Sequence, residues 1–133
     1  MERSLVLIKP DAVKNKNVGN IISIYEKHNF QIDQIKILIP DELLLSRHYE
    51  EHKGKDFYGK LIQFMRSDRV VALVLTGNNV VKEIRKINGS TNPLEAEEGT
   101  IRKAYGTGLT MNAVHASASV EEAEKEISIW FQQ

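Results

Sequence analysis

The stretch VVALVLTG (residues 70–77) decides the fold. It is an uninterrupted apolar run, rich in β-branched valine, and it ends at a glycine. This pattern is typical of a strand that is buried on both faces of a sheet. The segments on either side, 55–67 and 78–88, carry apolar residues at helical spacing, and Asn78 or Asn79 is a suitable N-cap for the second. We therefore expect a central strand flanked by two helices.

The N-terminal half supplies two more strands and two more helices. SLVLIK (4–9) is a short apolar run that predicts a buried strand, and 31–39 alternates isoleucine with polar residues, which predicts a half-buried strand. Helical spacing recurs over 18–30 and over 41–52, where Asp41 is placed to cap the helix.

The C-terminal part begins with an irregular stretch. Residues 89–111 show no clear period, although 94–106 has room for one short helix. A loop of this length in a compact domain is usually functional or disordered. AVHAS (113–117) predicts a final strand, and a capping-box pattern at Ser119 opens a helix that runs to about Trp130.

The order of these elements predicts the fold class. Helices alternate with strands, but four strands are few for a doubly wound sheet. Two βαβ halves that share one sheet fit better, so we expect an α/β (α+β), ferredoxin-like βαββαβ fold with a four-stranded antiparallel sheet and extra helices. The sequence shows no repeat or linker, so residues 1–133 are expected to form a single domain.

Composition excludes several classes of function. The 133 residues include 18 Lys and Arg against 18 Asp and Glu, and this balance gives no electrostatic case for general binding to nucleic acid or membranes. Any anion site must therefore be local. The absence of cysteine excludes disulfides and thiolate metal sites. The N-terminal apolar run is too short for a signal peptide or a membrane span, so we expect a cytoplasmic protein.

Common nucleotide and metal motifs are missing. No GxxxxGK[ST] loop occurs, and Gly106-Thr107-Gly108 precedes a strand where a dinucleotide fingerprint would follow one. His48 and His52 have the i, i+4 spacing of a helical metal pair. No glutamate follows His48 in an HExxH pattern and no third ligand is evident, so a solvated helix face is the expected reading.

The remaining candidate site centres on His115, in MNAVHASAS (111–119). It stands at the end of an apolar run and is followed by small residues. A neutral imidazole suits attack on phosphorus, because one ring nitrogen keeps a lone pair while the other donates. Other residues outside the core pattern have groups that suit the oxygens of a polyphosphate: Lys9, Arg85, Thr91, Asn92, Arg102, Asn112 and Ser117. Taken singly, each is better explained as a surface charge or a turn residue.

Several of these residues occur in blocks that together resemble a nucleoside diphosphate kinase. The blocks are Lys9-Pro10-Asp11, GNNVVK before Arg85, Thr91-Asn92-Pro93, Gly99-Thr100-Ile101-Arg102, Asn112-x-x-His115-Ala-Ser117, and EKEI…WF near the end. They appear in order and at matching spacing over almost the whole chain.

The resemblance implies a mechanism and a set of site residues. It implies a ping-pong reaction in which a nucleoside triphosphate phosphorylates His115 and a nucleoside diphosphate then takes the phosphoryl group, with Mg²⁺ held mainly by the nucleotide phosphates. It assigns contacts with phosphate or sugar to Lys9, Tyr49, Arg85, Thr91, Arg102 and Asn112. It assigns base stacking to Phe57 opposite Leu109, and support of the histidine to Ser117 and Glu126. It also implies a homo-oligomer, hexamer or tetramer, with Pro93 in the loop that helps to build the interface.

One position departs from the family pattern. Ala118 stands where the family usually has aspartate after the serine. A carboxylate near a helix N-terminus is worth roughly 0.3–1 kcal/mol, so we expect an active enzyme with a looser loop after His115. The competing interpretation is a regulatory nucleotide-binding protein that has lost turnover. A nucleic-acid binder is disfavoured by the neutral charge and by the lack of paired aromatic residues on strands.

Overall fold

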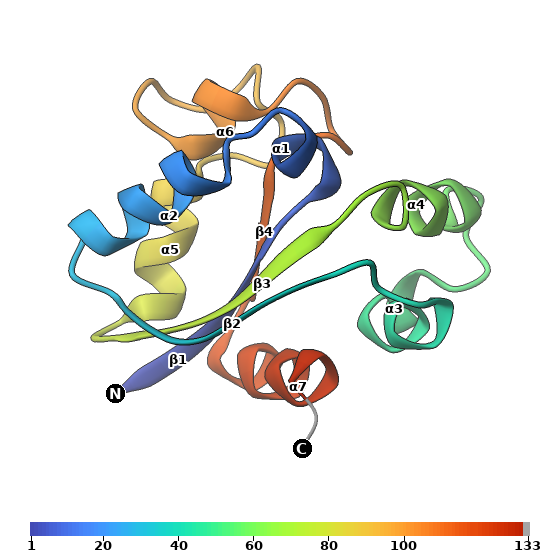
Figure 1. The fold of residues 1–133 in the computed structure, drawn as a ribbon, viewed down its shortest axis with the longest axis horizontal. Coiled ribbons are helices and arrows are strands. Elements are labelled where there is room, and N and C mark those ends of the chain that lie inside the picture. Colours follow the sequence, from blue (N-terminus) through green and yellow to red (C-terminus); the bar gives the residue numbers. More distant parts are fainter. Residues whose placement is uncertain (132–133) are drawn as a thin grey trace.

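The computed structural model describes residues 1–131. Its strands are β1 (Glu2–Ile8), β2 (Gln31–Leu38), β3 (Val70–Gly77) and β4 (Val114–Ala116). They form one antiparallel sheet in the order β2-β3-β1-β4, so the two longest pairings join β3 to β1 and to β2 (Figure 1). The expected four-stranded antiparallel sheet is confirmed.

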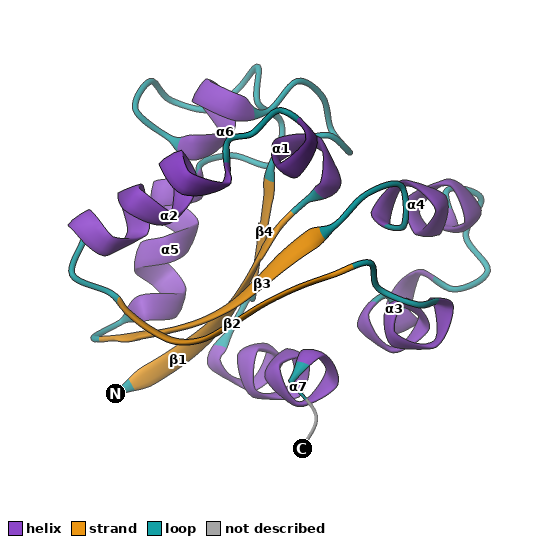
Figure 2. Cartoon of the chain, in the orientation of Figure 1, coloured by secondary structure: helices purple, strands orange, loops and turns teal. Residues whose placement is uncertain are grey.

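Short helices connect the strands, and one more follows the last strand (Figure 2). They are α1 (Pro10–Lys14), α2 (Val18–Lys27), α3 (Glu42–His48), the 3₁₀ helix η1 (Glu50–His52), α4 (Tyr58–Met65), α5 (Val80–Asn88), α6 (Ile101–Tyr105) and α7 (Val120–Trp130). The helix α1 was not predicted, and the helix expected over 41–52 ends at His48 before η1. Within residues 1–131, no helix combines the length and the apolar character that crossing a membrane requires.

The sheet is covered on both faces. The helices α2 and α5 lie on one side of it, and α3, α4 and α7 lie on the other (Figure 1). Along β3, Val71 and Leu73 belong to the core on the α2 and α5 side, whereas Ala72 and Val74 belong to the core on the α7 side. This two-sided burial explains why VVALVLTG is apolar at almost every position.

Two of the predicted N-caps make the expected hydrogen bond, and one does not. The Leu44 N–H donates to Asp41 Oδ1 (2.8 Å), and the Glu122 N–H donates to Ser119 Oγ (3.1 Å), so both of these N-caps are confirmed. Asn79 occupies the N-cap position of α5 but makes no capping hydrogen bond through its side chain. Its φ of 54° is left-handed, a conformation that asparagine tolerates better than most residues.

The strand β2 was predicted correctly, but its isoleucine face is not buried. Ile35, Ile37 and Ile39 are 50–59% exposed. β2 is an edge strand, and a register irregularity between Ile32 and Gln34 shifts the alternation along it. Residues 1–131 leave this apolar strip about half exposed.

Two glycines in the irregular stretch have left-handed φ angles, 88° at Gly89 and 89° at Gly99. A Cβ at Gly89 would also lie 2.7 Å from the Cβ of Thr100, whereas a Cβ at Gly99 would have no neighbour within 4 Å. Thr100 caps α6 by accepting a hydrogen bond from the Lys103 N–H. Gly89 therefore combines a conformational requirement with a steric one.

We expect Gly99→Ala to lower the free energy of unfolding by about 1–2 kcal/mol, the cost of a left-handed conformation for a residue with a Cβ. Gly89→Ala should cost distinctly more, because it adds the clash with Thr100. Denaturant unfolding of both variants checks this. Equal losses would show that the contact with Thr100 relaxes without cost.

Candidate active site

One open pocket of about 690 Å³ gathers the predicted residues. Most of the site residues inferred from the sequence line it, and two do not: Ser117 is fully buried behind it, and Asn92 accepts a hydrogen bond from the Leu94 N–H of its own loop. The lining comes from well-separated parts of the chain: Lys9 after β1, Tyr49 after α3, Phe57 before α4, Arg85 on α5, Thr91, Leu109 and Asn112 in loops, Arg102 on α6, His115 on β4 and Glu126 on α7. The fold thus brings together groups that are scattered in sequence.

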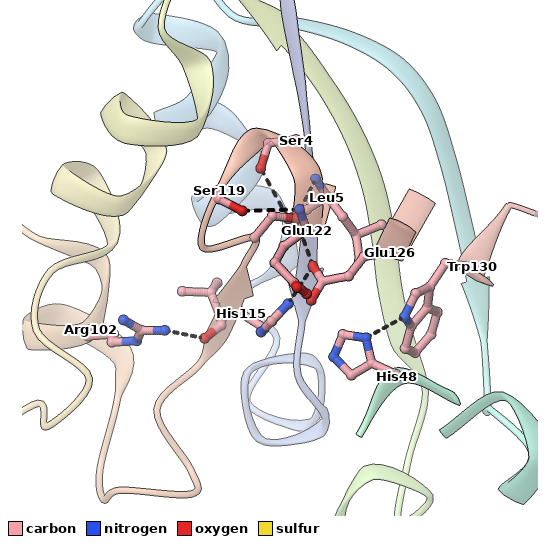
Figure 3. A network of polar contacts seen from close by, with 11 residues as sticks. Ser4, Leu5, His48, Arg102, His115, Ser119, Glu122, Glu126 and Trp130 are labelled. Carbon is pink, nitrogen blue, oxygen red and sulfur yellow. Dashed lines mark hydrogen bonds and ion pairs between the residues drawn. The ribbon is translucent and has the colours of Figure 1, made fainter. Parts of the chain in front are cut away.

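A buried carboxylate holds the histidine (Figure 3). Glu126 Oε1 lies 3.1 Å from His115 Nε2 and 2.7 Å from Ser117 Oγ. The Leu5 N–H of β1 donates to the same Ser117 Oγ (3.3 Å), which ties the group to the centre of the sheet. The Glu126 residue is only 8% exposed.

The charge state of Glu126 decides the tautomer of the histidine. Burial by itself would raise the pKa of Glu126, but the hydrogen bonds and charges of His115, His48 and Ser117 outweigh it and lower that pKa. An ionised carboxylate can only accept, so Ser117 and His115 Nε2 must both donate to it. In the neutral imidazole, His115 Nδ1 is therefore the nitrogen that keeps a lone pair, on a ring whose side chain is 27% exposed and lines the pocket.

Lys9 provides a buried positive charge at another wall of the pocket. Its Nζ donates to Thr110 C=O (2.7 Å) and to Asn112 Oδ1 (2.9 Å). Asn112 Nδ2 in turn donates to Thr91 C=O (3.0 Å). Burial lowers the pKa of Lys9 to about 8, with the charge of Asp11 opposing the shift and that of Arg102 adding to it. An ammonium group with only neutral acceptors keeps the capacity to bind an anion.

The two arginines differ in how they are held. The guanidinium of Arg102 donates to Gly89 C=O and to Val114 C=O, both at 2.8 Å. Burial lowers the pKa of Arg102, and its Nε is buried without a partner in the part of the chain that the structure describes. Arg85 is exposed on α5 at the pocket wall. Arg102 thus connects the loop to the strand that carries His115, whereas Arg85 points to solvent.

The rim of the pocket is apolar and aromatic. Phe57 is 49% exposed and Leu109 is 66% exposed, and both line the pocket. His52 meets Phe57 edge to face, with ring centroids 5.3 Å apart. Tyr49 lies deeper, and burial raises the pKa of its hydroxyl. Exposed aromatic surface beside a cationic pocket suits a ligand with a flat ring and an anionic tail.

The expected solvated face at His48 and His52 is wrong for His48. The Trp130 Nε1–H donates to His48 Nδ1 (3.0 Å), and the His48 ring lies edge to face against the His115 ring with centroids 4.7 Å apart (Figure 3). Burial lowers the pKa of His48 to about 3, so this ring is neutral. Its spacing of three and four residues from Leu45 and Leu44 placed it on an apolar helix face, which was the signal that could have revealed it.

Three of these side chains also meet the distance criterion for a metal site. The ligand atoms of His48, His115 and Glu126 lie within 4.8 Å of one another. Magnesium prefers oxygen ligands, whereas this group offers two imidazole nitrogens and a single carboxylate. The cluster therefore does not fit Mg²⁺.

Ala118 lies at the rim of the pocket and is exposed. The next residue, Ser119, still caps α7, and Glu126 two turns later still reaches His115. The departure from the family pattern leaves the hydrogen bonds to the histidine in place.

The comparisons with known proteins agree with this geometry. The family model described as nucleoside diphosphate kinase matches residues 2–133. The nucleoside diphosphate kinase of Methanocaldococcus jannaschii is 46% identical over 132 residues, which cover 99% of this chain and 94% of that protein. That of Clostridium perfringens is 44% identical, covering 98% of this chain and 92% of that protein.

Solved structures give the same result. The crystal structure of the nucleoside diphosphate kinase of Encephalitozoon cuniculi superposes with a TM-score of 0.96 at 38% identity, covering 100% of this chain and 90% of that one. That of Aquifex aeolicus superposes with a TM-score of 0.95 at 36% identity, covering 98% of this chain and 95% of that one. The chain belongs to the nucleoside diphosphate kinase family.

Proposed function

We propose that the protein is a nucleoside diphosphate kinase that moves the γ-phosphoryl group of a nucleoside triphosphate to a nucleoside diphosphate through His115. The observation that carries this proposal is the orientation of the histidine. Its Nε2 is tied to a buried carboxylate, which leaves the Nδ1 lone pair in a pocket whose lining includes Lys9, Arg85 and Arg102. The cytoplasmic location expected from the sequence stays a prediction.

The reaction consists of two displacements at phosphorus. His115 Nδ1 attacks the γ-phosphorus, the bond to the β–γ bridging oxygen breaks, and the nucleoside diphosphate leaves with the electron pair. In the second half, a terminal phosphate oxygen of another diphosphate attacks the same phosphorus, and the P–N bond breaks back to the histidine. Glu126 stabilises the positive charge that the ring carries while it is phosphorylated, as a carboxylate beside an imidazole does in hydrolases.

Other residues that line the pocket balance the negative charge of the phosphate oxygens. In phosphoryl transfer the protein mainly positions the reactants and stabilises charge on phosphate oxygens. We assign this role to Lys9, Arg85 and Arg102, with Thr91 and Asn112 as neutral partners and the Tyr49 hydroxyl beside them. Mg²⁺ enters bound to the nucleotide phosphates and so as part of the substrate, which accords with the poor fit of the histidine cluster to this ion.

The base would lie at the rim, between Phe57 and Leu109. Stacking on an aromatic face accepts any base, because every base offers a π-face. The exposure of Phe57 supports this assignment, since a ring that is 49% exposed gains apolar contact when a ligand covers it. We therefore propose that acceptor diphosphates of different bases are used with similar efficiency.

We also propose that the protein is a homo-oligomer, hexamer or tetramer. The uncovered edge strand β2 supports this, because Ile35 and Ile37 face solvent beside unpaired backbone groups. Leu94, next to Pro93 in the irregular stretch, is 84% exposed.

The function is tested by incubating the protein with labelled ATP and then with GDP, CDP or UDP. We expect an acid-labile label on the protein that moves to each diphosphate, with rates within roughly tenfold of one another, a barrier difference of about 1.4 kcal/mol. His115→Ala should fold but take up no label. Label that persists in this variant would exclude His115 as the carrier, and a wild type that binds ATP without labelling would favour the regulatory interpretation.

The two arginines should separate catalysis from stability. Arg85→Ala and Arg102→Ala should each lower turnover by on the order of 10²–10³, the usual loss for one donor that stabilises transition-state charge. Only Arg102→Ala should also lower the free energy of unfolding, by about 1–3 kcal/mol, because it leaves two carbonyls without their donor. Near-normal turnover of Arg102→Ala, or equal destabilisation of both variants, would contradict these assignments.

Assembly through β2 is tested by the mass in solution. The wild type should have a mass of about four or six times 15.1 kDa, and Ile37→Lys should reduce it. Leu43→Lys is the matched control, because Leu43 is equally apolar and 63% exposed, but on α3. A monomeric wild type, or a mass that Ile37→Lys leaves unchanged, would argue against this interface.

A further inference from the structure

The residue two positions before the histidine has an unusual backbone conformation. Ala113 has a φ of 75° and is fully buried. The Val114 N–H donates to Asn112 C=O (2.9 Å), which closes a three-residue turn around Ala113. A γ-turn with positive φ is the rare and strained form of this turn, and a residue with a Cβ adopts it only where the surroundings enforce it.

This turn separates the two halves of the candidate site. Asn112 on one side binds the Nζ of Lys9, and His115 on the other side stands in β4 against Glu126. A change of conformation at Ala113 would alter the distance between the cationic wall and the histidine. The turn is therefore placed to set the geometry of the reaction.

Both backbone polar groups of Ala113 are held by the segment that follows β1. The Ala113 N–H donates to Asp11 Oδ2 (3.1 Å), and the Lys9 N–H donates to Ala113 C=O (2.8 Å). Pro10 between them begins α1, which fixes the direction of the Asp11 side chain. Lys9 and Asp11 thus hydrogen-bond both backbone groups of Ala113, the residue at the centre of the turn.

Burial of the Asp11 carboxyl group lowers the stability of the fold. Asp11 is 9% exposed, its Oδ1 has no partner among residues 1–131, and burial raises the pKa of its carboxyl against the opposing effects of Lys9 and the Ala113 N–H. A buried carboxyl group with an unsatisfied oxygen destabilises a fold, so its presence here indicates a role other than stability. Among residues 1–131, the one hydrogen bond that the Asp11 side chain makes outside α1 is to the Ala113 N–H of the strained turn.

We propose that Asp11 is a positioning residue that holds the strained turn at Ala113 and so sets the place of His115 relative to Lys9 and Asn112. This inference rests on the proposed function, because it concerns the rate at which His115 is phosphorylated. Asp11 acts through the backbone and touches neither nucleotide nor histidine. What it supplies is a hydrogen-bond acceptor at a fixed point.

The test is the single-turnover rate of His115 phosphorylation at saturating ATP in a set of variants. Asp11→Ala should slow it by on the order of 10–100-fold, as expected for a misplaced reacting group. Asp11→Asn keeps an acceptor oxygen and should stay within about threefold of the wild type, a barrier difference of about 0.7 kcal/mol. Adding Ala113→Gly to Asp11→Ala should restore the rate by at least half of the loss, measured on a logarithmic scale. Glycine adopts a positive φ without strain.

Ala116→Gly is the matched control, since Ala116 is a buried alanine in β4 that lies outside the left-handed region. It should restore nothing in the Asp11→Ala background. A general stability role of Asp11 would give no selective rescue at position 113, so equal behaviour of the two glycine variants would overturn the proposal. An Asp11→Asn variant as slow as Asp11→Ala would also overturn it, because charge near Lys9 would then be what matters.

Two further outcomes are informative. If Asp11→Ala fails to fold, an Asp11→Ala/Ala113→Gly protein that folds and is phosphorylated supports the proposal, and one that still fails to fold contradicts it. If the wild type itself takes up no label from ATP, the proposed function fails. If the wild type reacts normally and the Asp11 variants react at the same rate as the wild type, only the positioning role of Asp11 fails.

Discussion

The carboxylate of Glu126 accepts hydrogen bonds from Ser117 and from His115, and the chemistry of the pocket depends on this shared oxygen. An ionised, mostly buried carboxylate needs donors, and the two that it has fix both its own position and the tautomer of the histidine. The position of Glu126 depends in turn on α7, which Ser119 caps at its start and which buries Ile127 and Trp130 against β1 and β3. The packing of α7 on the sheet thus determines which nitrogen of His115 keeps its lone pair.

The strand order makes the rest of the site possible. Because β1 lies between β3 and β4, the residues that follow β1 are adjacent to the turn that leads into β4. Lys9 and Asp11 therefore meet residues 110–113, which are about a hundred positions away in sequence. The irregular stretch then passes over the same end of the sheet, and Arg102 ties it to Val114. Lys9 and His115 are thus held by two paired strands, β1 and β4, and Arg102 is hydrogen-bonded to β4.

Much of the fold could be predicted from local patterns, for reasons visible in the structure. VVALVLTG is buried on both faces, and Asp41 and Ser119 make the capping hydrogen bonds that their positions suggested. The helices α1 and α6 have five residues each, too few to show a period. The isoleucines of β2 mark a strand correctly, but hydropathy does not tell whether a second molecule or the chain itself would cover them.

The site was less accessible to local reasoning. Pattern alone identified His115 and the polyphosphate candidates, but the roles of Glu126, Tyr49 and Phe57 came only from the family resemblance, because their positions depend on tertiary packing. His48 was misread because two histidines at helical spacing suggest a surface pair, whereas α3 ends at His48 and turns its ring inward toward Trp130. The strained turn at Ala113 depends on a positive φ angle that nothing in the sequence indicates.

The most direct test of the account is to determine which ring nitrogen carries the phosphoryl group. The phosphoenzyme formed with ATP would be denatured in alkali, where phosphohistidine survives, and its two isomers distinguished by ³¹P NMR against synthetic standards. Because Nε2 donates to Glu126, the account predicts phosphorylation at Nδ1 of His115 alone. A phosphoryl group on Nε2, or on a residue other than His115, would contradict it.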